Sequence, residues 1–282
     1  MRPPRPSPAL VLALGALAGL GVGFTASAEE PPVLTDVPKD VKATPLAGGA
    51  KFQETYYWVT CEDDAKGERD TELLDPKGNS LGKVRADFAK NLRLEGTGRT
   101  LEGKTLNWAG NGRYSVVKHP WGTGAKGALL EPFRSLAVDP KEIPIGTRIL
   151  IPQAIGALLP DGSVHDGVFR ADDTGGAIKG KHVDVFCGLK RDMKILQGRG
   201  IDKAPLFLLD KDDRKALPPL KFPRPATVRF SKALVSAKPE VETLTAEALE
   251  GGKKVTVLAR EGAFLKLGEG RWIEALALDL RS

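Results

Sequence analysis

Residues that bind metals or act as strong nucleophiles are scarce in this chain. Its 282 residues include two cysteines and three histidines. His119, His165 and His182 show neither metal-ligand spacing nor the context of a Cys–His catalytic pair. Arginine-rich helices and zinc-finger spacing are also lacking, so the formal charge of +6 suits an anionic polymer surface without indicating nucleic acid. We expect no metal, no organic cofactor and no nucleic-acid partner.

The chain also lacks an apolar run of membrane-spanning length followed by a stop-transfer pattern. The apolar stretch Ala9–Gly23 follows Arg2 and Arg5 and precedes Ala26-Ser27-Ala28, which predicts a secretory signal peptide over residues 1–28. The alternative is an uncleaved N-terminal anchor. No cysteine lies near the predicted cleavage site, so no stable membrane anchor is expected. We expect the mature protein to be periplasmic, associated with the outer membrane or cell wall, or secreted.

The two cysteines, Cys61 and Cys187, are the kind of pair that an oxidising compartment joins. We therefore predict a disulfide between them. The alternative is a reactive thiol.

Proline and glycine divide the remaining chain into segments of different texture. Runs of β-branched and aromatic residues between Pro and Gly turns predict a mainly β fold, with a short amphipathic helix near residues 84–94. The predicted segments are a flexible tether (29–50), a barrel domain (51–215), a Pro-rich linker (216–226) and a small β module (227–282). The last of these resembles the bacterial Src-homology-like domains of wall-binding proteins.

Three aspartates stand at predicted strand ends or strand centres beside Gly-rich turns. They are Asp139 before Pro140, Asp173 before Thr-Gly-Gly, and Asp184 between valines. Short strands of a closed barrel bring residues distant in sequence together, so the three carboxylates are expected to meet in one cleft. Crowded like charges and apolar neighbours raise the pKa of a carboxyl group. The alternative is that these aspartates only accept hydrogen bonds from turn amides. This alternative applies to Asp139 and Asp173 and least to Asp184, which lies between apolar β residues instead of in a turn.

The motif Asp173-Thr-Gly-Gly-Ala-Ile-Lys-Gly followed by His182-Val-Asp184, with Asp139 upstream, resembles the three-aspartate (3D) domain family. This family includes enzymes of the membrane-bound lytic murein transglycosylase A type. The similarity covers roughly residues 134 to 188 and implies a six-stranded double-psi β-barrel. The segments 94–99 and 107–112 look like a shortened form of that enzyme's second domain. The fold class is therefore mainly β, with a small upstream α/β portion and a small C-terminal β-barrel module.

The resemblance implies a lytic transglycosylase that cleaves the β-1,4 bond between N-acetylmuramic acid and N-acetylglucosamine and leaves a 1,6-anhydro sugar. Asp184 takes the position of the catalytic acid, with Asp173 and Asp139 in support. Protein groups expected to touch the glycan are Trp108, Trp121, Lys179, His182 and Thr174. The expected partner is a peptidoglycan glycan strand, bound by a monomer.

The alternative function is a non-catalytic, expansin-like protein that binds wall polysaccharide. Double-psi barrels serve both functions, so the fold by itself does not choose between them. The shortened second domain and the wall-binding-like tail favour this alternative.

Overall fold

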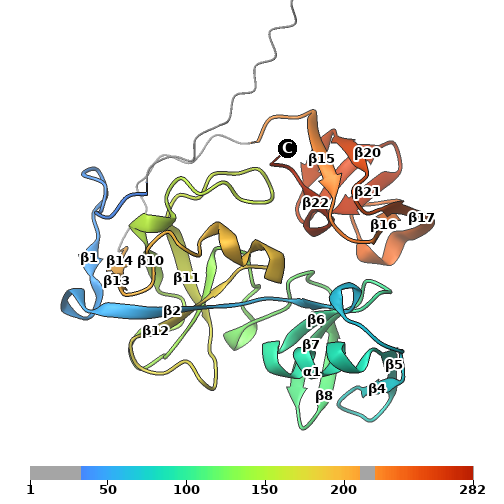
Figure 1. Cartoon of the computed structure of the whole chain (residues 1–282), viewed down its shortest axis with the longest axis horizontal. Coiled ribbons are helices and arrows are strands. Elements are labelled where there is room, and N and C mark those ends of the chain that lie inside the picture. The colour runs from blue at the N-terminus through green and yellow to red at the C-terminus, as the bar shows by residue number, and fades with distance from the viewer. Residues whose placement is uncertain (1–32, 210–219, 282) are drawn as a thin grey trace, which may run out of the picture.

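The computed structural model describes residues 33–209 and 220–281. The predicted signal peptide, the start of the predicted tether and part of the predicted linker lie outside these ranges. Figure 1 shows three units: a barrel-shaped sheet, a small α/β unit beside one end of it, and a C-terminal β unit. Among the described residues, no helix is long and apolar enough to cross a membrane.

The first unit, the barrel sheet, is a nearly closed mixed sheet of eight strands in the order β1-β14-β10-β11-β9-β12-β2-β13. Its strands are β1 (Thr44–Pro45), β2 (Lys51–Tyr57), β9 (Ser135–Val138), β10 (Arg148–Leu150), β11 (Val168–Asp173), β12 (His182–Phe186), β13 (Ala204–Pro205) and β14 (Phe207–Leu208). The mainly β class is confirmed. Two features differ from the expectation: the sheet has eight strands, and residues 44–50 of the predicted tether join it. β1 pairs with β14, and next to this pairing Leu46 N–H donates to Leu206 O.

The core of the barrel comes from the alternation of side chains along β9 and β12. Leu136, Val138, Val183 and Val185 are all fully buried in one apolar cluster on the inner side of the sheet. The residues between them, including Asp184, point to the opposite side. Alternation thus places a carboxyl group on the outer side of a strand whose apolar residues fix its position.

The second unit, here the α/β module, comprises residues 58–117. Its strands are β3 (Thr60–Cys61), β4 (Thr71–Leu74), β5 (Ser80–Val84), β6 (Thr97–Arg99), β7 (Thr105–Gly110) and β8 (Arg113–Val117). Its helix α1 (Ala86–Glu95) is the one predicted from the apolar spacing, and it buries Phe88 and Leu92 completely. α1 ends because Gly96 adopts the left-handed conformation (φ 77°), with its N–H bonded to Leu92 O.

The third unit, the C-terminal β module, comprises residues 224–279. Its strands are β15 (Arg224–Val228), β16 (Lys232–Ser236), β17 (Leu244–Glu250), β18 (Lys254–Val257), β19 (Ala259–Glu261), β20 (Phe264–Gly268), β21 (Arg271–Glu274) and β22 (Leu278–Asp279). β15 begins within the segment predicted as linker. The strands form two small sheets around one apolar cluster.

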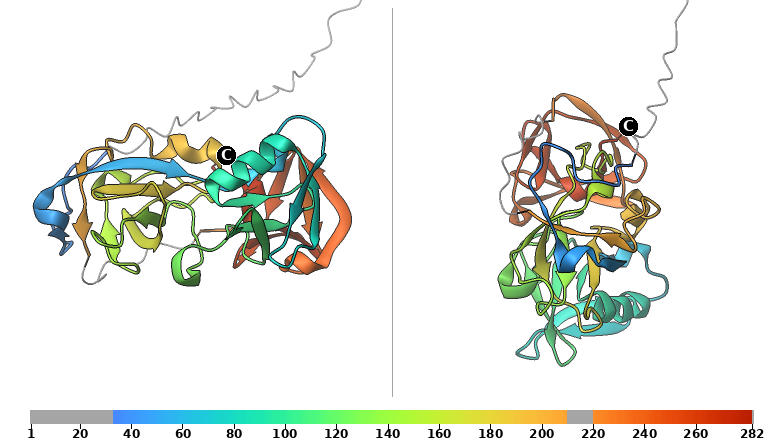
Figure 2. Two further views of the ribbon diagram at one scale, coloured as in Figure 1. Left: turned by 90° about the horizontal axis from the view of Figure 1, so that it is seen from below. Right: turned by 90° about the vertical axis from the view of Figure 1, so that its left-hand side faces the viewer.

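The described residues also contain short 3-10 helices. They are η1 (Leu46–Gly49), η2 (Glu62–Asp64), η3 (Ala125–Gly127), η4 (Pro152–Ala154), η5 (Lys190–Ile195), η6 (Val241–Thr243) and η7 (Ala275–Ala277). The left-hand view of Figure 2 shows β2, in blue, running from the barrel sheet toward the α/β module.

The predicted disulfide is wrong: both cysteines are free and buried. Cys61 packs in the apolar cluster of the C-terminal β module, whereas Cys187 packs in the barrel core. Each thiol lies near a backbone carbonyl, that of Val59 for Cys61 (3.7 Å) and that of Tyr57 for Cys187 (3.3 Å). Burial raises the pKa of Cys61 to about 12, and that of Cys187 is raised by the same cause, so neither is a reactive thiolate near neutral pH.

Candidate active site

Strand pairing brings two of the three predicted aspartates into one row. On β9, Ala137 is the register partner of Asp173 on β11 and also of Asp184 on β12. Asp184 is in turn paired with Thr55 on β2. Adjacent strands lie about 4.8 Å apart, so the Cα atoms of the two aspartates are on the order of 10 Å apart, with one small residue between them.

This row lies on the floor of a cleft of about 440 Å³. Ala137, Asp173 and Asp184 line it from the barrel sheet, together with the Gly-Gly turn that follows Asp173. The opposite wall belongs to the α/β module and contains the end of α1 and parts of β6 and β7. Hydroxyl, amide, carboxyl and indole groups are all present, the mixture that a sugar chain requires.

Asp184 is half-buried in this cleft. Thr55 Oγ1 donates to Asp184 Oδ1 at 2.7 Å, and His182 Nε2 lies 2.8 Å from the same Thr55 oxygen. Since the threonine proton goes to Asp184, His182 donates to Thr55 from Nε2. Burial raises the pKa of Asp184 above its ordinary value, while the Thr55 hydrogen bond and the nearby His182 oppose this rise. The group therefore retains its proton to a higher pH than a free aspartate.

Replacing Thr55 tests this balance. Thr55→Val keeps the shape but removes the hydroxyl that favours the ionised carboxylate, so we expect the pKa of Asp184 to rise further. Carbon-13 carboxyl NMR titration measures it. Thr71→Val is the matched control, because the Thr71 hydroxyl also donates to an aspartate, Asp70 (3.1 Å), at an exposed site. An unchanged pKa of Asp184 in Thr55→Val would contradict the assigned hydrogen bond.

Asp173 lies at the end of β11, on the same side as Asp184. Tyr57 O–H donates to its Oδ2 at 3.2 Å, and Thr174 N–H donates to its Oδ1 at 2.8 Å. Burial raises the pKa of Asp173, and these two hydrogen bonds oppose the rise. Both of its oxygens therefore have donors, which makes Asp173 a fixed acceptor at the edge of the cleft.

Asp139 does not line the cleft, so the expected meeting of all three aspartates is wrong. β9 ends at Val138, and the chain turns at Asp139. Its carboxylate accepts N–H bonds from Lys141 (3.0 Å) and Gly180 (2.8 Å), and these amides lower its pKa. The alternative reading of Asp139, as a residue that bonds turn amides, matches this placement.

Asp139 should consequently affect stability more than chemistry. A carboxyl whose folded-state pKa lies below the ordinary 3.8 stabilises the fold above that pH and loses this contribution as the pH falls through its folded-state pKa. We expect Asp139→Asn to lower the melting temperature at pH 7, and the difference from wild type to shrink below about pH 4. Thermal unfolding followed across this pH range checks it, and a difference that is constant with pH would contradict it.

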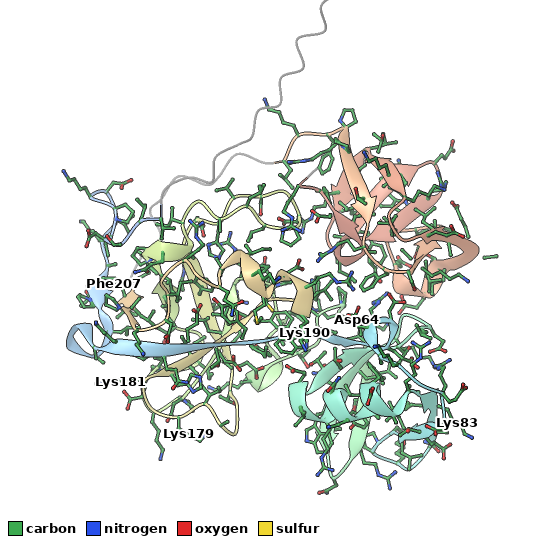
Figure 3. All side chains as sticks on the ribbon, in the orientation of Figure 1. Asp64, Lys83, Lys179, Lys181, Lys190 and Phe207 are labelled. Carbon is green, nitrogen blue, oxygen red and sulfur yellow. The ribbon has the colours of Figure 1, made fainter. Side chains whose placement is uncertain are left out.

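The predicted glycan-contacting residues are divided between the cleft and other places. Trp108 and Thr174 line the cleft, and Trp108 is 38% exposed with its ring edge-on to Tyr114. Trp121 lies elsewhere, edge-on to Phe186 at 6.1 Å and packed against apolar clusters. Lys179 is exposed and projects from the barrel away from the α/β module (Figure 3). His182 contributes through Thr55 rather than as a cleft wall.

Glu95, at the end of α1, is a cleft residue that the sequence did not single out. Trp58 N–H donates to its Oε2 at 3.4 Å, and burial raises its pKa to about 7, with Asp184 adding to the rise. Thr55 was also missed. A glutamate at a helix end and a threonine in a strand carry no signal until the sheet register and the helix position are known.

A larger cavity of about 570 Å³ lies between the α/β module and the C-terminal β module, near the Arg99–Glu274 ion pair. None of the three aspartates lines it, so we assign the chemistry to the smaller cleft. Within the described residues, no group of three or more His, Cys, Asp or Glu side chains is arranged to hold a metal ion.

Comparison with known proteins identifies the class. The 3D domain family matches residues 134–210, the part of the chain that carries β9 to β14 and the three aspartates. The chain is thus a 3D-domain protein. No curated protein matches it.

Solved structures similar to this chain include lytic transglycosylases. Escherichia coli MltA with bound chitohexaose is 15% identical (TM-score 0.43; 57% of this chain, 71% of that one). LtgG of Burkholderia pseudomallei is 19% identical (TM-score 0.33; 55% and 70%). A membrane-bound lytic murein transglycosylase from Agrobacterium tumefaciens is 16% identical (TM-score 0.33; 64% and 71%).

Proposed function

We propose that this protein is a lytic transglycosylase that cleaves the N-acetylmuramic acid–N-acetylglucosamine β-1,4 bond of peptidoglycan. One observation carries the proposal: a half-buried aspartate, Asp184, has a raised pKa and faces a polar cleft with an exposed tryptophan at its side. A carboxyl group that keeps its proton near the working pH is what general acid catalysis requires. The alternative is an expansin-like protein that only binds the wall.

In the proposed reaction, Asp184 protonates the glycosidic oxygen as the bond to the anomeric carbon breaks. The C6 hydroxyl of the same muramic acid residue attacks that carbon and gives its proton back to Asp184. The enzyme is thereby restored and the product has a 1,6-anhydro ring. Thr55 holds the carboxyl group of Asp184 in place through its hydrogen bond. Asp173 is positioned to accept a hydrogen bond from a hydroxyl group of the sugar.

Three structural assignments belong to the same proposal. We propose that the strands of the barrel sheet within residues 51–215 form a double-psi β-barrel, and that the C-terminal β module is a Src-homology-like wall-binding unit. We also propose that residues 1–28 are a signal peptide directing the chain to the periplasm or cell wall. Trp108 and Thr174 are the proposed glycan contacts in the cleft.

Digestion of purified sacculi tests the proposal. We expect the full-length protein to release 1,6-anhydromuropeptides, detected by mass spectrometry. Because a raised pKa keeps Asp184 protonated to a higher pH, activity should fall as the pH rises through that value. Intact sacculi at every pH, together with retention of the protein on insoluble peptidoglycan, would refute the enzyme and support the binding protein.

A further inference from the structure

The cleft contains a carboxyl group, Glu95, that the single-acid reaction does not use. Glu95 is the last residue of α1, and the left-handed Gly96 that follows ends the helix there. The helix is fixed from below by Phe88 and Leu92, which are fully buried. A Cβ at Gly98 would meet Leu92 Cδ1 at 2.8 Å, so β6 packs directly against this helix. The position of Glu95 in the cleft wall is therefore set by a rigid element.

Glu95 and Asp184 line the same cleft from different units, the α/β module and the barrel sheet. The negative charge of Asp184 contributes to the raised pKa of Glu95, after burial as the main cause. Hydrogen bonding is also alike: among the described residues, each carboxyl has one oxygen with a donor, Thr55 for Asp184 and Trp58 N–H for Glu95. Asp173, by contrast, has donors on both oxygens.

The other charged groups around Glu95 do not neutralise it. Lys190 on η5 acts against the rise in the pKa of Glu95, but it lies over the Trp58 ring, 5.1 Å from its centroid. Figure 3 shows Lys190 at the junction of the barrel sheet and the α/β module. Arg93 of α1 lines the cleft and is exposed. Other titratable groups near Glu95 are Asp173, Tyr56, Tyr57 and the Cys187 thiol, none of which is a cation. His182 lies near Asp184 and acts against the rise in its pKa.

We propose that Glu95 is the second catalytic carboxyl of this cleft and that it shares a single proton with Asp184. The inference rests on the proposed transglycosylase function. Two interacting carboxyl groups release their protons in two steps that belong to the pair, so there is a pH range in which the pair holds one proton. When the glycan is bound, Asp184 carries that proton beside the leaving oxygen. Ionised Glu95 then faces the positive charge that develops on the sugar ring.

Protons and bonds balance in this scheme. The bond between the anomeric carbon and the leaving oxygen breaks, and that oxygen takes the proton of the pair. The bond between the C6 oxygen and the anomeric carbon forms, and the C6 hydroxyl returns one proton to the pair. Glu95 forms no covalent bond.

The test compares Glu95→Gln with Asp184→Asn and with Glu142→Gln, the same change at an exposed site outside the cleft. The first measurement is carboxyl NMR titration of the full-length protein. Asp184→Asn should lower the pKa of Glu95 from about 7, and Glu95→Gln should lower the pKa of Asp184 by a similar amount, because coupling is reciprocal. Glu142→Gln should change neither.

The second measurement is the pH profile of anhydromuropeptide release. Above the pKa of Asp184, each unit by which this pKa falls reduces the protonated fraction about tenfold. Glu95→Gln should therefore move the alkaline side of the profile to lower pH and cut release at pH 7.5 about tenfold. The amide oxygen of the glutamine can still accept the Trp58 N–H, so the substitution preserves the structural contact of Glu95. If Glu95 has only a structural role, the pH profile of release and the pKa of Asp184 will be unchanged in Glu95→Gln, and that result would overturn the inference. Inactive wild type would refute the proposed function and with it the catalytic role of Glu95, whereas the titrations would still decide whether the two carboxyl groups share a proton.

Discussion

Asp184→Asn is expected to reduce release of 1,6-anhydromuropeptides from sacculi by about a hundred- to ten-thousand-fold. Asparagine has nearly the same shape and its amide oxygen still accepts the Thr55 O–H, seen at 2.7 Å in the wild type. It has no proton to give to the glycosidic oxygen and no carboxylate to take one from the C6 hydroxyl. The measurement is mass spectrometry of soluble products at the pH optimum of the wild type.

Asp139→Asn is the matched control for this variant. It is the same chemical change in the same motif, but its carboxylate faces turn amides instead of the cleft. We expect it to retain activity at 25 °C, and we expect both variants to bind insoluble peptidoglycan as the wild type does. Equal losses of activity in the two variants would show that the effect of Asp184 is structural and would remove its role as acid.

Much of the barrel could be predicted because strand alternation is a local property. The pattern Val183-Asp184-Val185 predicted a carboxyl group flanked by buried residues, and both valines are fully buried. The turn at Asp139 is equally local, and the alternative of an amide-bonding aspartate was available from its position before a proline. The helix near residues 84–94 followed from apolar spacing in the same way.

What could not be predicted depends on pairing between distant segments. The meeting of Asp173 and Asp184 was expected, but the register that pairs both with Ala137 was not, because nothing in the sequence fixes it. Glu95 joins them only because α1 ends at the cleft. The disulfide prediction failed for the same reason: Cys61 and Cys187 belong to different apolar clusters, which their spacing does not reveal.

A buried ion pair joins the C-terminal β module to η5, which follows β12 of the barrel sheet. Arg229, just after β15, bonds both oxygens of Asp192 on η5 at 2.5 and 2.6 Å, and the two side chains are 6% and 4% exposed. Removing one partner leaves an unpaired buried charge, which typically costs 3–5 kcal/mol. This makes the pair the site of the largest expected loss of stability.

We therefore expect Arg229→Met to lower the free energy of unfolding by about 3–5 kcal/mol at pH 7. Burial already raises the pKa of Asp192 and Arg229 opposes that rise, so without Arg229 the carboxyl will take up a proton more readily. The loss should accordingly shrink as the pH falls, and the double variant with Asp192→Leu should recover most of it. Arg271→Met is the control, since its pair with Glu247 is exposed and should contribute about 1 kcal/mol or less. Urea unfolding followed by tryptophan fluorescence measures all three variants, and equal losses in Arg229→Met and Arg271→Met would show that burial of the Arg229–Asp192 pair does not stabilise the contact between the two units.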